Sequence, residues 1–128
     1  MNKKIIHTEN APAAIGAYSQ AIQIGNTVYL SGQIPLEAKT MQLVSEDFNQ
    51  QAHQVFKNLR AVAEAAGTDL NSLVKVNAYL TDLKNFASFN EIMALYIDAP
   101  FPARAAIGVA QLPKGALVEV EGVLVLSN

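Results

Sequence analysis

The chain has neither cysteine nor tryptophan among its 128 residues. Without cysteine it can form no disulfide, no thiolate zinc site and no thiol nucleophile, and this composition is typical of the reducing cytoplasm. No stretch approaches the roughly 18 consecutive apolar residues that a membrane span needs. The beginning of the chain carries two lysines but lacks the apolar core of a secretory signal. We therefore expect a cytoplasmic protein with no membrane partner.

Positive charge is also scarce. The formal net charge is −2, the seven lysines are scattered, and Arg60 and Arg104 are the only arginines. A nucleic-acid-binding protein usually carries a clustered basic surface, so the sequence predicts no nucleic-acid partner. There are no internal repeats, linkers or low-complexity segments, and half of the chain is apolar. Residues 1–128 are therefore predicted to form a single domain with a sizeable core.

Apolar residues at helical spacing predict two helices. The first covers residues 45–66, with Ser45 as a plausible N-cap and Gly67 just beyond its end. The second covers residues 86–98 and stops before Pro100. Other segments are rich in β-branched residues or alternate between apolar and polar residues. They predict strands at 4–7, 18–24, 27–31, 73–80, 104–111 and 117–126.

The order of these elements predicts an α+β fold, with two helices packed on one face of a single mixed sheet. Gly25-Asn26 is a two-residue hairpin loop, in which glycine supplies the positive φ of a type II′ turn. In the strand at 73–80, alternation places one set of apolar residues on the core face: Val74, Val76, Ala78 and Leu80. No predicted element covers the other sheet face, and a partner subunit could supply that cover.

Arg104 is unusual because it begins a strand of small residues. A period of two places Ala106 and Gly108 on the same face, which leaves a trough beside a fork of donors that suits a planar carboxylate. The alternative is a structural pairing of Arg104 with Glu119 or Glu121 across strands. These two glutamates share one face of the last strand, where they mark either the rim of a cleft or a solvated strand end.

Two further polar side chains are candidates for the site. Asn90 lies inside the apolar stripe of the second helix, so its amide needs partners; it either contacts a ligand or braces a nearby loop. Tyr18 opens a predicted strand and offers an apolar body with one polar tip. His7 and His53 show no spacing of a catalytic triad or a metal site, and the chain has no glycine-rich phosphate loop.

Five segments carry a resemblance to a known family over nearly the whole chain, in the same order. They are ENAPAAIGAYSQA (9–21), SGQIP (31–35), VAEAAG (62–67), DLKNFASFN (82–90) and FPARAAIGVAQLPKGALVEVE (101–121). Together they resemble the Rid (YjgF-like) family, and within it the RidA-type enamine/imine deaminases. The resemblance implies a chorismate-mutase-like fold and a homotrimer, in which the sheets form a central barrel and the clefts lie between subunits.

The resemblance also implies an activity, the hydrolysis of 2-imino or 2-enamine monocarboxylic acids to 2-oxo acids and ammonia. Arg104 would hold the substrate carboxylate and Glu119 would position the attacking water. The other residues implied to line the cleft are Tyr18, Ser31, Gly32, Asn90 and Ala106. Ala106 departs from the family, in which cysteine is common at this position. No metal or organic cofactor is implied, because a protonated imine is already electrophilic.

Other functional classes remain open at this stage. The same cleft could serve a regulatory module that binds a small carboxylate without turnover. A chorismate-mutase-type isomerase acts on a substrate with two carboxylates, and a chain with a single strand arginine, Arg104, fits a monocarboxylate better. An RNA-directed role is attributed to some members of the resembled family, but the acidic charge balance gives it no support.

Overall fold

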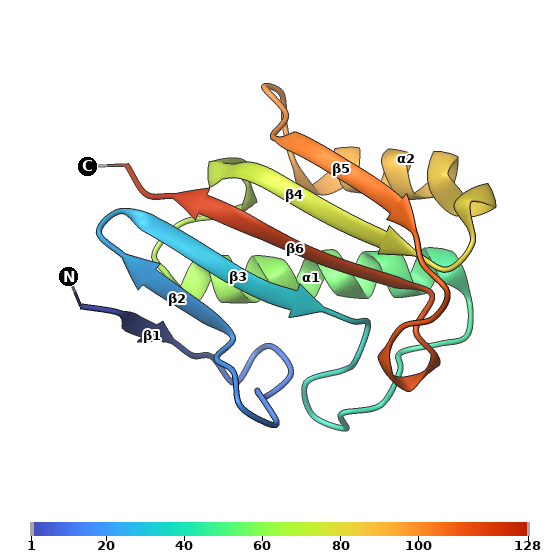
Figure 1. Cartoon of the computed structure of the whole chain (residues 1–128), viewed down its shortest axis with the longest axis horizontal. Coiled ribbons are helices and arrows are strands. Elements are labelled where there is room, and N and C mark those ends of the chain that lie inside the picture. Colours follow the sequence, from blue (N-terminus) through green and yellow to red (C-terminus); the bar gives the residue numbers. More distant parts are fainter. Residues whose placement is uncertain (1, 128) are drawn as a thin grey trace.

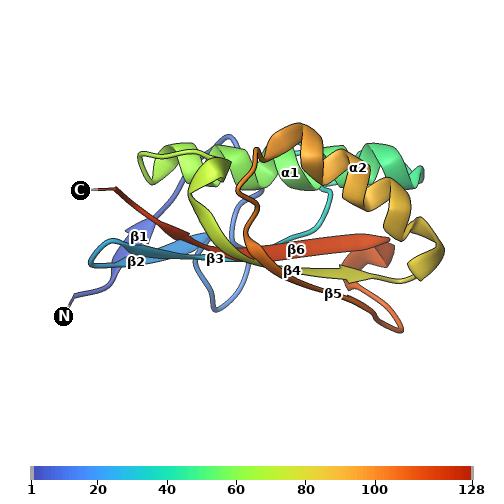
Figure 2. The same cartoon turned by 90° about the horizontal axis from the view of Figure 1, so that it is seen from above.

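The computed structural model describes residues 2–127 and shows one six-stranded sheet with two helices on one of its faces (Figures 1 and 2). The helices are α1 (Phe48–Ala65) and α2 (Phe86–Tyr96), with short 3-10 turns at Leu70–Ser72, Leu83–Asn85 and Pro113–Gly115. The strands are β1 (Lys4–Ile6), β2 (Ala21–Ile24), β3 (Thr27–Gln33), β4 (Leu73–Leu80), β5 (Ala103–Gly108) and β6 (Val118–Val125). Within residues 2–127 no helix is long and apolar enough to cross a membrane.

The strand order in the sheet is β1-β2-β3-β6-β4-β5. β4 and β5 are parallel and are joined by a crossover through α2, whereas the other neighbouring strands are antiparallel. The sheet is therefore mixed, and the predicted α+β fold with two helices on one face is confirmed.

The hydrophobic core lies between the helices and the sheet. Phe56 of α1 and Phe89 of α2 are fully buried, and their ring centroids lie 5.6 Å apart. Beneath them, Val76 of β4 and Val120 of β6 present fully buried side chains from the sheet. Since each such side chain contributes about 1.5–3 kcal/mol when it leaves water, this layer fixes how the helices sit on the strands.

The start of α1 differs from the sequence prediction. The helix begins at Phe48, and its N-cap is Asp47, whose carboxylate accepts a hydrogen bond from the backbone N–H of Gln50 at 3.0 Å. Ser45 instead accepts from the backbone N–H of Asp47 at 2.9 Å. The prediction of Ser45 as the N-cap is therefore wrong: two capping-type residues lie close together, and the one nearer the apolar stripe takes the role.

Both predicted glycine turns are confirmed. Gly25 has a φ of +59° in the two-residue loop between β2 and β3, where Ile24 pairs with Thr27. Gly67 has a φ of +90° just after α1, and the next backbone N–H reaches back to the carbonyl of Ala63 at 3.1 Å. This pattern closes the helix with its last carbonyls satisfied.

β4 does not alternate throughout its length. Its register against β6 shifts between Leu73 and Lys75, which is a β-bulge, and Val74 is 47% exposed. The prediction that Val74 faces the core is therefore wrong, because an extra residue in one strand reverses the alternation on the other side of it. Beyond the bulge the predicted core residues are buried: Val76, Ala78 and Leu80.

The segment before β2 is a loop, so the prediction that Tyr18 opens a strand is also wrong. β2 begins at Ala21, and the preceding segment folds around the buried side chain of Gln20. That amide donates to the carbonyls of Pro12 at 2.8 Å and Thr8 at 3.0 Å, and it accepts from the backbone of Thr8 at 2.7 Å. The loop thus satisfies its backbone through a side chain rather than through a neighbouring strand.

The sheet face opposite the helices, called the open face below, has no covering element within residues 2–127 (Figure 2). One row of paired residues crosses it from β1 to β4: Ile5, Ile22, Tyr29, Val123 and Lys75. Ile5 is 67% exposed and Tyr29 is 53% exposed. The chain alone therefore presents large apolar side chains on this face to solvent.

Candidate functional site

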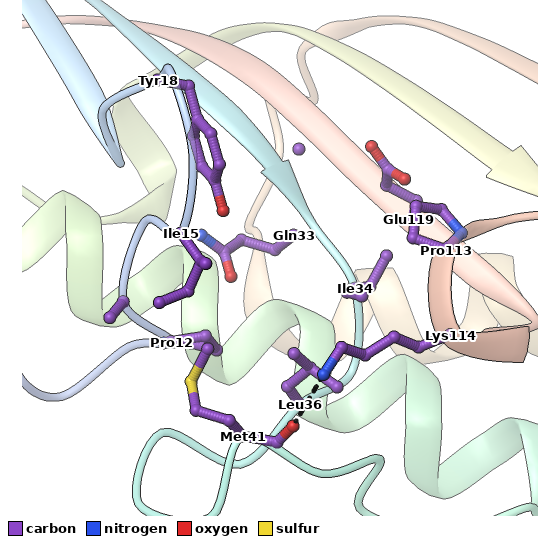
Figure 3. A pocket seen from close by; sticks show the side chains of 12 residues that line it. Pro12, Ile15, Tyr18, Gln33, Ile34, Leu36, Met41, Pro113, Lys114 and Glu119 are labelled. Atoms are coloured by element: carbon purple, nitrogen blue, oxygen red, sulfur yellow. Dashed lines mark hydrogen bonds between the residues drawn. The ribbon is translucent and has the colours of Figure 1, made fainter.

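One hollow of about 490 Å³ brings together three of the residues expected at the site, Glu119, Gly32 and Tyr18 (Figure 3). Glu119 projects from β6, and Tyr18 lines the same hollow from the loop before β2, across from Glu119 (Figure 3). Gly32 lies in β3, where the pairing with β6 is irregular between Leu30 and Gln33. A Cβ atom at position 32 would overlap the Glu119 carboxylate, so the side chain of Glu119 needs glycine beneath it.

Glu119 occupies an environment that favours its protonated form. Burial raises the pKa of its carboxyl above the ordinary 4.5, and the negative charge of Glu121 raises this pKa further. Glu121 lies two residues along the same face and accepts hydrogen bonds from the Tyr79 hydroxyl at 3.0 Å and the Asn77 amide at 3.4 Å. The two carboxylates thus differ, since Glu121 is held by donors and Glu119 faces the hollow.

Ser31 serves the site indirectly. Its hydroxyl donates to the carbonyl of Ser19, and its backbone N–H donates to the carbonyl of Gln20 at 3.0 Å. These two bonds fasten the end of the loop that carries Tyr18 to β3. Ser31 is therefore positioned to hold Tyr18 in place, and it does not line the hollow around Glu119.

Arg104 lies at a second hollow, of about 380 Å³, which Asn90 and Phe101 also line. The guanidinium donates to the Asn90 side-chain oxygen at 2.8 Å and lies 3.6 Å from the sulfur of Met93. Its Cζ atom is 5.2 Å from the centroid of the Phe86 ring, a cation–π distance. α2 therefore holds one edge of the guanidinium, and within residues 2–127 no other side chain takes its remaining hydrogens.

Arg104 and Glu119 lie on opposite faces of the sheet. In β5, Arg104 pairs with Val76, which is buried on the helix-covered face. In β6, Glu119 pairs with Tyr79 on the open face. The alternative in which Arg104 pairs with Glu119 or Glu121 within one chain is therefore wrong. A single chain carries two separate hollows, one beside each residue, and these are called the Arg104 and Glu119 half-sites below.

The trough of small residues beside Arg104 is only partly open. Ala106 faces the helices and packs against the hydrophobic core. At Gly108, an added Cβ would meet the Leu83 side chain at 3.2 Å, so Leu83 covers that end of the strand. The hollow opens toward Phe101 and Pro102 instead of along β5, which corrects the expectation of a continuous trough.

Sequence reasoning missed three residues that shape the half-sites. Phe86 appears in the apolar stripe of α2, yet its ring lies against Arg104. Met41 and Lys114 line the Glu119 hollow, and each has a φ of +58°, which a non-glycine residue rarely adopts. Nothing in the residue pattern around Met41 signals this.

Within the described part of the chain, no three His, Asp or Glu side chains group as metal ligands would.

Known proteins match this arrangement over nearly the full chain. Residues 8–126 match the family model described as Endoribonuclease L-PSP. The crystal structure of RidA from an Antarctic Psychrobacter species shares 52% identity and a TM-score of 0.93, over 96% of this chain and 99% of that one. A protein of Dermatophagoides farinae named 2-iminobutanoate/2-iminopropanoate deaminase is 46% identical over 97% of both chains. The mouse protein of the same name is 46% identical over 96% of this chain and 91% of its own.

The fold, a mixed sheet with two helices on one face, is thus shared with a solved RidA structure. The chain belongs to the Rid (YjgF-like) family, and the resemblance found in the sequence is confirmed.

Proposed function

We propose that this protein hydrolyses 2-iminobutanoate, 2-iminopropanoate and their enamine tautomers to 2-oxo acids and ammonia. Full-length relatives at 46% identity carry the name of this activity. The observation that carries the proposal is the pair of half-sites, one with a guanidinium held by Asn90 and one with a half-buried carboxylate. The reaction is that of a hydrolase acting on a C=N bond in the cytoplasm, without a cofactor.

Arg104 is proposed to bind the substrate carboxylate. A guanidinium presents parallel N–H donors that match both oxygens of a carboxylate. Asn90 holds its inner edge and Phe86 lies against its plane, so that the outer edge can receive the substrate. This arrangement fixes the position of the imine carbon relative to the anchor. Orientation of this kind accounts for much of the rate gain in reactions with a reactive substrate.

Glu119 is proposed to act on water. The carboxylate takes a proton from water while the water oxygen bonds to the carbon of the protonated imine, and the C=N double bond becomes a single bond whose electron pair goes to the nitrogen. The same proton then passes to the amino nitrogen, and the C–N bond breaks so that ammonia leaves. As the carbonyl forms, the hydroxyl group gives its proton to the Glu119 carboxylate, which passes it to the departing ammonia and is restored. Because burial and Glu121 raise the pKa of Glu119, its protonated form is accessible between these steps.

The two roles can meet only if subunits associate, because Arg104 and Glu119 lie on opposite faces of one sheet. We propose a homotrimer in which the open faces meet at the centre and each cleft joins the Arg104 half-site of one subunit to the Glu119 half-site of another. Such an assembly would bury exposed apolar side chains of this face, among them Ile5, Tyr29 and Ile107.

A coupled assay tests the activity. A threonine or serine dehydratase would generate the enamine in situ, and release of the 2-oxo acid would be followed with and without this protein. We expect faster release with the protein present. If the rate equals that of spontaneous hydrolysis while 2-oxobutanoate still binds, the regulatory carboxylate-binding module is the correct reading.

The description of the matched family model raises one other candidate, cleavage of RNA. The net charge of −2 and the scattered lysines give no basic track for a phosphate backbone. Incubation with single-stranded RNA at low and high salt separates this candidate from the deaminase. We expect no cleavage and no salt-dependent binding.

A further inference from the structure

The hollow beside Glu119 has a polar end and an apolar end. Glu119 and Tyr18 stand at one end, where the proposed chemistry takes place (Figure 3). Ile15, Leu36 and Met41 supply apolar lining away from the carboxylate. A charged group also lies at this end, the Lys114 ammonium, which is hydrogen-bonded to the Met41 carbonyl. A methyl or ethyl side chain on the substrate would fill only a small part of about 490 Å³. The apolar end is therefore a candidate pocket for a longer substrate side chain.

The segment that carries the apolar end, residues 35–44, is a closed loop. Leu36 and Leu43 form an isolated β-bridge. The backbone N–H of Val44 donates to the carbonyl of Pro35 at 2.9 Å, which joins the two ends of the loop. The buried Asn58 of α1 donates to the carbonyl of Leu36 at 3.0 Å and fastens the loop to the helix. A wall built in this way is preformed.

Met41 is held at the tip of this loop by two further bonds. Its backbone N–H donates to the carbonyl of Glu37 at 2.9 Å, and its carbonyl accepts from the Nζ atom of Lys114 at 3.3 Å (Figure 3). Met41 and Lys114 both have a φ of +58°. A left-handed conformation is unfavourable for a non-glycine residue, and it persists where the surroundings fix it. The bonds around Met41 therefore hold its side chain against the hollow.

We propose that Met41 is a specificity-determining residue, which limits the length of the substrate side chain, and that Lys114 is the positioning residue that holds it there. The inference rests on the proposed function and concerns which lengths of aliphatic side chain on a 2-imino acid the site accepts. Each additional buried methylene contributes about 0.8 kcal/mol, or roughly fourfold in affinity, until the chain reaches Met41.

The test measures selectivity along a series of side-chain lengths. An amino-acid oxidase generates imino acids in situ from alanine, 2-aminobutanoate, norvaline and norleucine, and turnover is compared for wild type, Met41→Ala, Met41→Phe and Lys114→Ala. Binding of the matching 2-oxo acids is measured by calorimetry on the same variants. Lys39→Ala, an exposed lysine on the same loop, is the matched control for Lys114→Ala.

We expect Met41→Ala to raise the norleucine-to-alanine ratio of kcat/KM by about tenfold, and Met41→Phe to lower it, with parallel changes in oxo-acid binding. Lys114→Ala should shift the ratio in the direction of Met41→Ala, and Lys39→Ala should leave it unchanged. If the ratio of affinities for the longest and the shortest 2-oxo acid is the same in wild type, Met41→Ala and Met41→Phe, the inference is overturned, even if every variant is active. If that ratio of affinities changes with the Met41 substitutions but no variant shows turnover, the inference stands and the proposed deaminase activity is wrong.

Discussion

At the scale of single residues, the surroundings of Arg104 explain why an arginine stands on a strand of small side chains. Asn90 accepts from one end of the guanidinium and Phe86 lies against its plane, so the side chain is oriented before any ligand arrives. Asn90 thus braces the Arg104 side chain and not the nearby loop expected from the sequence, while its contact with a ligand stays a prediction. A lysine would keep the positive charge, but its ammonium group would not provide the planar pair of N–H donors.

Arg104→Lys should therefore lose most activity. A bidentate, charge-assisted pair with a carboxylate contributes on the order of 2–4 kcal/mol, so kcat/KM should fall roughly 30- to 1000-fold. Arg60→Lys is the matched control, because Arg60 lies on α1 against the ring of Tyr96 and belongs to neither half-site. Steady-state kinetics with in situ imine would check both variants. Wild-type kinetics for Arg104→Lys would exclude the anchor role.

The environment of Glu119 predicts the acidic side of the pH profile. Its carboxylate must be deprotonated to accept a proton from water, so kcat/KM should fall as the pH drops through its raised pKa. Replacing Glu121 with glutamine removes a negative charge that raises this pKa, so the acidic limb should move to lower pH. Glu91→Gln, an exposed glutamate on α2, should leave the profile unchanged. An unmoved limb in Glu121→Gln would show that Glu119 is not the titrating base.

At the scale of elements, the helices and the glycine turns follow from the sequence because local rules decide them. The apolar stripe predicts α1, and Gly67 closes it with the expected positive φ. Val74 and Tyr18 were placed wrongly because long-range contacts decide them. A bulge against β6 turns Val74 outward, and the amide of Gln20 organises the loop that carries Tyr18.

The candidate site was predictable to the same extent. Its residues were found from family motifs, whereas their division between two sheet faces depends on strand register. Neither Arg104 nor Glu119 reveals in its neighbours which face it will occupy, because small and apolar residues flank both. Met41 could not be found at all, since its position depends on a hydrogen bond that its N–H donates to Glu37 and one that its carbonyl accepts from Lys114, rather than on residue type.

The contact of β3 with β6 at Gly32 predicts a substitution that affects activity more than stability. An added Cβ would displace the Glu119 side chain, whose far end can move, so Gly32→Ala should lower kcat about tenfold or more. Its free energy of unfolding should change by less than about 1 kcal/mol. At Gly122, by contrast, the added Cβ would meet the backbone oxygen of Lys75 at 2.9 Å.

Gly122→Ala is therefore the matched control, and it should destabilise the fold because backbone cannot move as freely as a side chain. Denaturant unfolding and steady-state kinetics of both variants separate the two effects. A Gly32→Ala variant that keeps the wild-type kcat would mean that the position of the Glu119 carboxylate does not limit turnover.

At the scale of the whole molecule, association of subunits would explain both the uncovered open face and the placement of Arg104 and Glu119 on opposite faces of the sheet. A sheet covered on one side leaves Ile5, Tyr29 and Ile107 exposed, and monomers rarely tolerate such a surface. If Arg104 is the anchor and Glu119 the base, as proposed, one chain cannot complete the site alone, because the two residues lie on opposite faces of the sheet. Association through the open face would address both features, and the mass in solution should be three times the 13.7 kDa of one chain.

Complementation between two inactive variants tests the shared cleft directly. Arg104→Ala and Glu119→Gln should each be inactive as pure trimers, since every cleft lacks one group. If equal amounts are unfolded together and refolded, random assembly should give an intact cleft at about one quarter of the sites, and the mixture should recover about that share of wild-type activity. The two variants refolded separately and then combined on ice serve as the control, and light scattering verifies that all samples have the same mass. A co-refolded mixture no more active than this control would place both groups in the cleft of a single subunit and would overturn the trimeric site.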